Sequence, residues 1–487
     1  MPFQFTLPSP GPLQWSSFFE SSTHPGLLAE ATSAHAHLRH ALKSRSQGKT
    51  ADPAVHLSRL LECIDRYVPL LLAIEAALNS YGVADSSIDI VLKQEVQCQW
   101  RTSIVVSKPP LTKSRRLEIK GIDSIICYVL LTKAEAHMLS AKQCISSLSS
   151  LSELGTEQGR LGTIQKAVQE VQQAASILSH ASTRSSQIPS HALSPDITTQ
   201  SLDALQAMAT AEFCLLMAFK DDHQLEAAIR ERDQTNLDWM VAPTKIPKAR
   251  SLLLSRLCCA AAEYLYDAIG GLGFLVTQDR VRLADGLLKY LTHLAQTARA
   301  RACRFTAIHR EGDGKTGEAL AWLRAAEQEL GFKNAIASEQ SRGLSLSRMK
   351  ASWQDSHQMK RHERRQETCK EDHEVAGRLE ERIVVTVLYK QWTKQNDLSN
   401  TQRIPDHISL PNTLPSGRAL AQVAPWQPPS LESGHLQRMT VSTEDMFGSM
   451  DLAADENDSS GEDDPIQLAT SDALPGNSLG QTRTAYV

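Results

Sequence analysis

Apolar side chains recur three and four residues apart along most of the chain, from about residue 25 to residue 394. Clear stripes consist of Leu57, Leu60, Leu61, Ile64 and Val68; of Leu205, Met208, Ala209, Leu215, Leu216 and Phe219; and of Leu320, Leu323 and Leu330. This spacing places each set on one face of a helix. Breakers at residues 108–110, 182–195, 243–247 and 312–314 predict connections between long helices, and the glycines at 270–273 are expected to end another helix.

The two ends of the chain have a different pattern. Apolar residues alternate with polar ones at positions 3–7, which predicts a short extended or strand segment within residues 1–20. After Asn396 the chain has eight prolines, no sustained periodicity, and nine acidic but no basic residues between Glu444 and Asp464. Such a segment buries too little apolar surface to offset the entropy lost on ordering. We therefore expect a folded unit at residues 1–397 and a disordered, acidic, proline-containing tail at 398–487.

Composition supports an all-α fold. Aromatic residues make up only 5% of the 487 residues, which disfavours a β-sandwich or barrel because strands favour aromatic and β-branched side chains. The chain carries 51 basic and 55 acidic residues, for a net charge of −4. A near-neutral balance argues against nucleic-acid binding by the whole chain, which normally requires a basic excess.

The cysteines and the apolar runs indicate a soluble intracellular protein. The nine cysteines are scattered, without C-x-x-C spacing, so we interpret them as small hydrophobes in a reducing compartment. No Lys or Arg precedes Arg39, so the charged start of a signal peptide is missing. The apolar run at residues 68–73 is far shorter than the roughly 20 residues that span a bilayer.

Motifs that could carry catalysis lack their required context. Residues 314–316 resemble the end of a phosphate-binding loop, but His309 stands where that motif needs a glycine. The G-x-S-x-G match at residues 476–480 lies in the predicted tail, without the strand and helix that strain a nucleophilic serine. His35, His37 and His40 are interpreted as surface histidines, because no carboxylate or cysteine beside them completes a metal site. We predict no enzyme, no cofactor and no metal.

Several short motifs together resemble the BRO-domain family, of which ALIX is a member. They are Gln99-Trp100-Arg101; Arg116-Leu117-Glu118; Ala209-Thr210-Ala211-Glu212 followed by Leu215-Leu216; Ala261-Ala262-Glu263-Tyr264; and Gly317-Glu318-Ala319-Leu320-Ala321 followed by Leu323, the most specific of the set. Within that family, three further motifs look like those of the fungal pH-response regulators: residues 392–397, residues 400–402 and Pro415-Ser416-Gly417-Arg418. The resemblance covers residues 1 to about 420. It departs where the glutamine-rich helix of the family reads Ala-Thr-Ala-Glu and where its phenylalanine pair is Leu215-Leu216.

The resemblance implies a curved, all-helical scaffold of TPR-like helix pairs with a small N-terminal sheet. It also implies a concave-face site for the amphipathic C-terminal helix of an ESCRT-III core subunit. The expected role is that of a non-catalytic adaptor, cytoplasmic and recruited to the plasma membrane or endosomes without direct membrane contact. With other pH-signalling components it would support proteolytic activation of a zinc-finger transcription factor at alkaline pH. The alternative is an adaptor in endosomal cargo sorting. A third hypothesis, from a different functional class, is a hydrolase within the helical body.

Carried over position by position, the family's binding patch falls on Leu215, Leu253 and Leu257. Leu253 and Leu257 are four residues apart, so they share a helix face and can touch one partner helix. Arg250 and Arg256 flank them and can steer an acidic partner. The alternative is that all three leucines belong to the core. Periodicity by itself favours that alternative, whereas the resemblance favours the patch.

Overall fold

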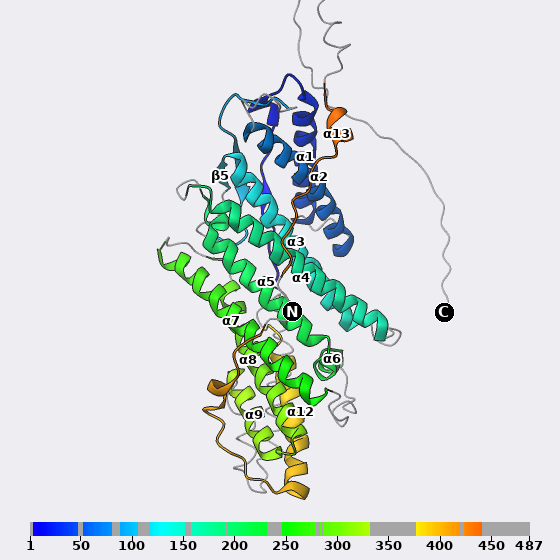
Figure 1. Ribbon diagram of the computed structural model, residues 1–487, viewed down its shortest axis with the longest axis vertical. Coiled ribbons are helices and arrows are strands. Elements are labelled where there is room, and N and C mark those ends of the chain that lie inside the picture. The colour runs from blue at the N-terminus through cyan, green and yellow to red at the C-terminus, as the bar shows by residue number, and fades with distance from the viewer. Residues whose placement is uncertain are drawn as a thin grey trace, which may run out of the picture. The chain divides into compact units, whose positions relative to one another are not determined.

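The computed structural model describes residues 3–46, 52–79, 88–105, 116–150, 157–189, 193–230, 246–278, 283–284, 286–331, 376–418 and 423–440. Within these residues the fold is dominated by long helices (Figure 1). They are α1 (Pro25–Ser46), α2 (Pro53–Asn79), α3 (Ile122–Ser150), α4 (Glu157–Ser185), α5 (Thr199–Phe219), α6 (His223–Arg230), α7 (Lys248–Gln278), α8 (Leu287–Gly312), α9 (Thr316–Glu329), α12 (Arg378–Gln395) and the short α13 (Ser433–Gln437). The prediction of an all-helical fold is confirmed.

Helices that follow one another in the chain pack side by side. The main contacts join α1 to α2, α3 to α4, α4 to α5, α5 to α7, α7 to α8 and α8 to α9, while α12 returns to pack on α6, α8 and α9. The helical span begins at Pro25 and ends at Gln395, close to the expected limits. The break expected at 312–314 does separate α8 from α9. The glycines at 270–273, in contrast, do not end a helix, because α7 continues to Gln278.

Short strands cover the N-terminal end of the helical body. Strands β1 (Ser9–Pro10), β4 (Gln97–Arg101) and β5 (Leu117–Lys120) form an antiparallel sheet in the order β1-β4-β5, and β2 (Phe19–Glu20) pairs with β3 (Val91–Leu92). The small sheet was expected, and the short extended or strand segment predicted within residues 1–20 is confirmed by β1 and β2, although the alternating residues 3–7 themselves do not pair as a strand. Phe3 and Phe5 are instead buried core residues, and the Phe3 ring lies 5.3 Å from that of Tyr290 in α8.

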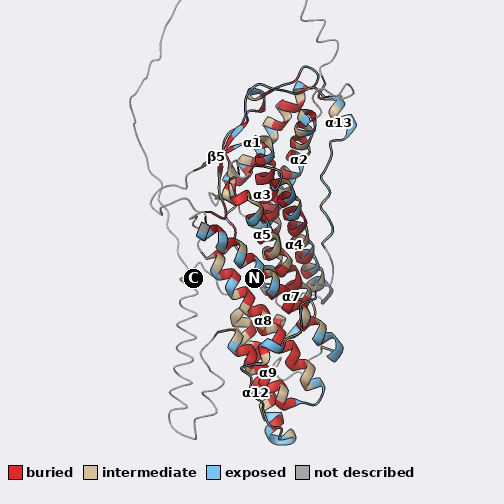
Figure 2. Ribbon diagram, turned by 60° about the vertical axis from the view of Figure 1, so that its left-hand side comes forward, coloured by how far each residue is buried: buried red, intermediate tan, exposed pale blue. Residues whose placement is uncertain are grey.

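Helix α5 lies in the centre of the core, between α4 and α7. Figure 2 shows the buried residues gathered where the helices face one another. The neighbouring helix α7 comes close to α5 because Gly271 has no side chain, and a Cβ added there would lie 3.3 Å from the Ala204 Cβ. Among the described residues, α5 and α7 are the helices long and apolar enough to cross a membrane by length and composition. The burial of α5 identifies it as a core helix.

Buried charges join three separate parts of the body. Arg304 of α8 pairs with Asp222, in the turn between α5 and α6, and with Glu381 of α12, whose Oε1 lies 2.6 Å from the Arg304 Nε. All three side chains are almost completely buried. An unpaired buried charge is costly, so the guanidinium and both carboxylates stabilise the fold only as a set.

The folded unit extends well beyond the expected boundary at residue 397. Residues 401–418 and 423–440, here called the strap, pack on the helices, and the compact unit reaches Thr440. The Gln402 side chain binds the start of α9, the Pro411 carbonyl accepts from Arg299, and the Trp426 ring lies 4.9 Å from that of His180. Met439 is buried near Gly26 of α1. The predicted start of the tail at residue 398 is therefore too early, because the compact unit continues to Thr440. Residues 441–487, the rest of the predicted tail, lie outside the described residues.

Candidate functional site

The candidate site is the outward face of α7. This helix is rich in Leu and Ala, yet fewer than half the residues of its most apolar stretch are buried. Its exposed apolar side chains are Leu252, Tyr266, Phe274 and Val276. A core helix buries its apolar positions against neighbours. An apolar helix with this much open surface is suited to accept another helix.

The three candidate leucines differ in their exposure. Leu253 is partly exposed, but Leu215 is 5% exposed and Leu257 only 1%. Both buried leucines belong to the main hydrophobic core, where α5 packs against α7. The expected strip of three exposed leucines is therefore corrected: Leu253 reaches the surface, and Leu215 and Leu257 are buried in the core.

Neither candidate arginine is free of partners. Arg250 binds Asp221 through its Nε and Nη2 atoms, at 2.8 and 2.6 Å from the Asp221 Oδ2. The Arg256 Nε donates to the Ser416 carbonyl of the strap at 3.3 Å. Both arginine side chains keep contact with solvent, so these pairs are weak enough to exchange with a partner.

Strap residues that lie directly on α7 were not among the candidates. The Gly417 N–H donates to the Glu263 Oε1 at 2.9 Å, and the Arg418 N–H donates to the Arg256 carbonyl at 3.1 Å. A Cβ at Gly417 would fall less than 3.0 Å from the Cα and N atoms of Ala260. Only glycine allows this approach. The motif Pro415-Ser416-Gly417-Arg418 was visible in the sequence, but nothing in it indicated α7 as its neighbour.

Buried titratable groups elsewhere serve the fold. Burial raises the pKa of Glu212 in α5 to about 7, although the Tyr290 hydroxyl donates to its carboxylate at 2.7 Å. His35, expected at the surface, is 1% exposed, and its ring nitrogens lie within hydrogen-bond distance of the Tyr67 hydroxyl and the Gly11 carbonyl. Burial lowers the pKa of His35 to about 4, so it stays neutral. These groups are held by packing and hydrogen bonds inside the body, away from solvent.

Cysteines and metal ligands give no sign of a reactive centre in the part of the chain that the structure describes. The eight cysteines there are free thiols, and burial raises the pKa of Cys214, Cys258 and Cys259 well above the usual thiol range. A thiol with a raised pKa is a poor nucleophile. Within the same residues, no group of three His, Cys, Asp or Glu side chains is arranged to hold a metal ion.

Comparison with known proteins gives concordant matches. Residues 147–450 match the family described as BRO1-like domain. The pH-response regulator protein palC of Emericella nidulans is 32% identical over 519 residues, which cover 100% of both chains. The solved ALIX BRO1–CHMP4C complex has a TM-score of 0.50 at 15% identity, over 88% of this chain and 95% of that one. ALIX bound to the SIVmac239 PYKEVTEDL late domain has the same score and identity, over 88% of this chain and 49% of that one. At this identity the two structures establish a shared fold.

Proposed function

This chain belongs to the BRO1-like domain family, and from this premise we propose that it is a non-catalytic adaptor in fungal ambient-pH signalling. The full-length relationship to a pH-response regulator supports this role. With other components of the pathway, the adaptor supports proteolytic activation of a zinc-finger transcription factor at alkaline pH. It acts from the cytoplasm and is recruited to the plasma membrane or to endosomes through its partners.

The partner we propose is the amphipathic C-terminal helix of an ESCRT-III core subunit, docked on α7. The observation that carries this proposal is that α7 is strongly apolar but incompletely covered. A BRO1 domain of the same fold has been solved in a complex named for CHMP4C. Leu253 makes the direct contact, and Leu215 and Leu257 provide the apolar floor. Arg250 and Arg256 exchange their present partners for acidic residues of the incoming helix.

The proposal is tested by measuring binding of a fluorescent peptide with the sequence of that ESCRT-III helix. Leu253→Asp places a carboxylate in the contact and should weaken binding tenfold or more, since about 1.4 kcal/mol corresponds to a factor of ten. Val55→Asp is the matched control, because Val55 is an exposed apolar residue of α2 and lies outside α7. Equal binding by both variants would refute the site. Leu257→Asp should unfold the protein instead, because it buries a charge.

A deletion strain separates pH signalling from endosomal cargo sorting. Loss of a signalling adaptor should impair growth selectively at alkaline pH, with membrane-cargo turnover unchanged at acidic pH. Equal defects in cargo turnover at both pH values, without alkaline sensitivity, would favour the sorting role. Complementation with Leu253→Asp then shows whether the α7 face is needed for that phenotype.

A further inference from the structure

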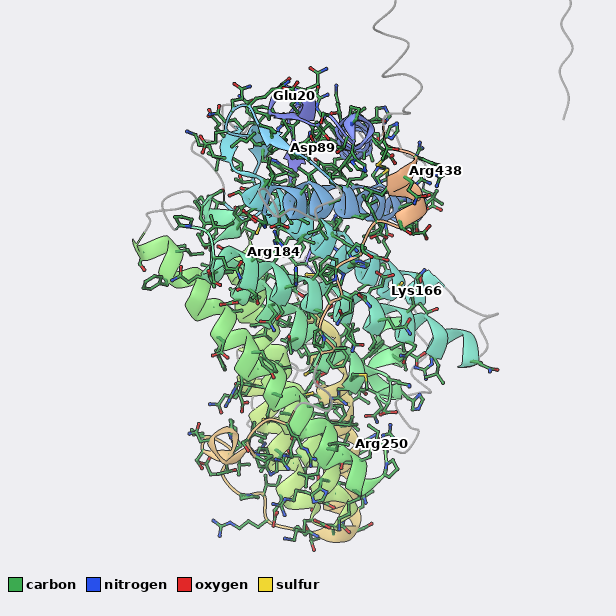
Figure 3. The ribbon with its side chains drawn as sticks, turned by 45° about the horizontal axis from the view of Figure 1, so that its top comes forward. Glu20, Asp89, Lys166, Arg184, Arg250 and Arg438 are labelled. Atoms are coloured by element: carbon green, nitrogen blue, oxygen red, sulfur yellow. The ribbon has the colours of Figure 1, made fainter. Side chains whose placement is uncertain are left out.

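The strap crosses α7 at its middle. Ser416, Gly417 and Arg418 are joined to α7 through three hydrogen bonds, two with Arg256 and one with Glu263. The strap then continues to the other end of the unit, where Arg438 lies beside α1 and α2, far from Arg250 near the start of α7 (Figure 3). One extended segment of the chain therefore runs across the face to which we assign the partner helix.

The crossing point lies on the same stripe of α7 as Leu253. Ala260 follows Leu253 by seven residues, two helical turns, and residues at that spacing share one face. Leu253 is partly exposed, whereas Ala260 is only 3% exposed and lies against Gly417. A partner helix that follows this stripe from Leu253 for two turns meets Gly417. The strap and the partner helix cannot occupy that position together.

The strap segment on α7 is held lightly between stronger anchors. Ser416 and Arg418 are exposed, and the hydrogen bonds of Arg256 with Ser416 and of Gly417 with Glu263 are solvent-exposed. On either side, Pro411 is buried and Trp426 packs on His180 and Lys133. Segments with few buried apolar contacts and exposed hydrogen bonds open locally at the lowest cost. Residues 416–418 can therefore leave α7 while Pro411 and Trp426 stay in place.

We propose that residues 416–418 act as an autoinhibitory cover of α7 that the incoming partner helix displaces. The inference rests on the proposed ESCRT-III site and adds its regulation. The apparent affinity for the partner helix then equals the intrinsic affinity multiplied by the fraction of molecules in which α7 is uncovered. Any change that lifts the cover strengthens binding without adding a contact to the partner.

The first test compares two glycines of the strap in the full-length chain. Gly417→Ala places a Cβ against the Ala260 backbone and must lift the segment, whereas a Cβ at Gly434 has open space around it. If α7 is covered in about nine molecules of ten, Gly417→Ala should tighten binding of the fluorescent ESCRT-III peptide about tenfold. Gly434→Ala should bind like the wild type. Circular dichroism and the melting temperature verify that both variants are folded.

The second test needs no variant. The Gly417 and Arg418 amides are hydrogen-bonded to α7, so their hydrogen exchange reports whether the cover is seated. Adding the peptide to the wild-type chain should speed exchange in fragments that contain these amides. Unchanged or slower exchange on binding would overturn the inference and indicate that the strap forms part of the site.

The outcomes separate the inference from the function on which it rests. Binding of equal strength by the wild type, Gly417→Ala and Gly434→Ala overturns the cover and leaves the ESCRT-III site standing. Weaker binding by folded Gly417→Ala overturns the cover in the same way. Failure of every variant to bind the peptide, Gly417→Ala included, overturns both the site and its regulation.

Discussion

Helices α5 and α7 lie side by side and have similar apolar compositions, but their surroundings differ. Of the most apolar stretch of each helix, 72% is buried in α5 and 44% in α7. α5 has helices on two sides, α4 and α7. Among the residues that the structure describes, α7 packs mainly on α5 and α8, and the strap crosses its outer side. A similar apolar composition is thus mostly buried in one helix and more than half uncovered in the other.

The comparison extends to the charges at the end of α5. Asp221 and Asp222 are consecutive, but Asp222 pairs with buried Arg304 and Asp221 pairs with exposed Arg250 of α7. Charges that stabilise the core are sealed from water, whereas those at the face of α7 remain exchangeable. The two neighbouring aspartates therefore differ in burial, and only Asp222 belongs to the buried ion-pair set.

The largest expected effect comes from this pair of aspartates. Asp222→Ala removes one partner of a buried ion pair and the side chain that accepts from the Leu225 N–H at the start of α6. It should lower the free energy of unfolding by about 3–5 kcal/mol. Asp221→Ala, the matched control, should lower it by about 1 kcal/mol or less. Urea unfolding measures both, and equal losses would contradict the division between core and exchangeable charges.

A second prediction compares leucines of the two helices. Leu205 of α5 is 1% exposed and Leu252 of α7 is 39% exposed. Leu205→Ala should cost about 2–5 kcal/mol because it leaves a cavity. Leu252→Ala should cost about 0.5 kcal/mol or less, as surface substitutions do. A large loss for Leu252→Ala in thermal or urea unfolding would show that its side chain is covered in solution.

How far the sequence leads can be judged from particular elements. The helices were predictable because apolar residues recur with the helical period, from Leu57–Val68 in α2 to Leu320–Leu330 in and after α9. The burial of Leu257 could not be predicted in this way. Leu253 and Leu257 share one stripe of the helix, and only the packing of α5 decides which of them is covered. Periodicity within a helix defines a face, but not what lies against it.

The strap was missed for a different physical reason. It is an extended, proline-containing segment whose anchors Pro411, Trp426 and Met439 are widely and irregularly spaced. Such a segment has no period, and its composition is typical of disorder. It is ordered by apolar surface that distant helices provide. The glycines at 270–273 were misjudged similarly: α7 continues through them although glycine has a low helix propensity, and Gly271 lies close against Ala204 of α5.

The third prediction concerns pH and the carboxylate that α5 buries. Burial raises the pKa of Glu212 from 4.5 to about 7, so the folded state holds its proton more tightly than the unfolded state. Its contribution to stability is complete below about pH 4.5 and is lost as the pH rises through 7. The loss is on the order of 3 kcal/mol. Glu212→Gln should remove this part of the pH dependence, measured by urea unfolding at pH 5 and pH 8. If the free energy of unfolding falls equally between the two pH values in the wild type and in the variant, the prediction is wrong.

The smallest effect is expected where the strap contacts α3 and α4. Trp426→Ala removes the ring that packs on His180 and under the Lys133 ammonium, 5.3 Å from its centre. The loss should be about 1 kcal/mol, typical of a partly exposed cation–π contact. In Trp426→Ala, the rate of proteolytic cleavage within residues 423–440 should rise by a larger factor than the rate of global unfolding. Gln427→Ala, at the exposed neighbouring position, is the control and should leave cleavage unchanged.

The reach of the strap also determines when the molecule can be completed during its synthesis. His435 contacts Glu30, which precedes it by 405 residues. At roughly 5–20 residues per second, a ribosome needs about 20–80 s to make the intervening chain. The helices can pair with their neighbours as they emerge, but the strap cannot contact α7 until residue 417 has followed. On the nascent chain, the outer side of α7 therefore lacks its contacts with Ser416, Gly417 and Arg418 until those residues have been made.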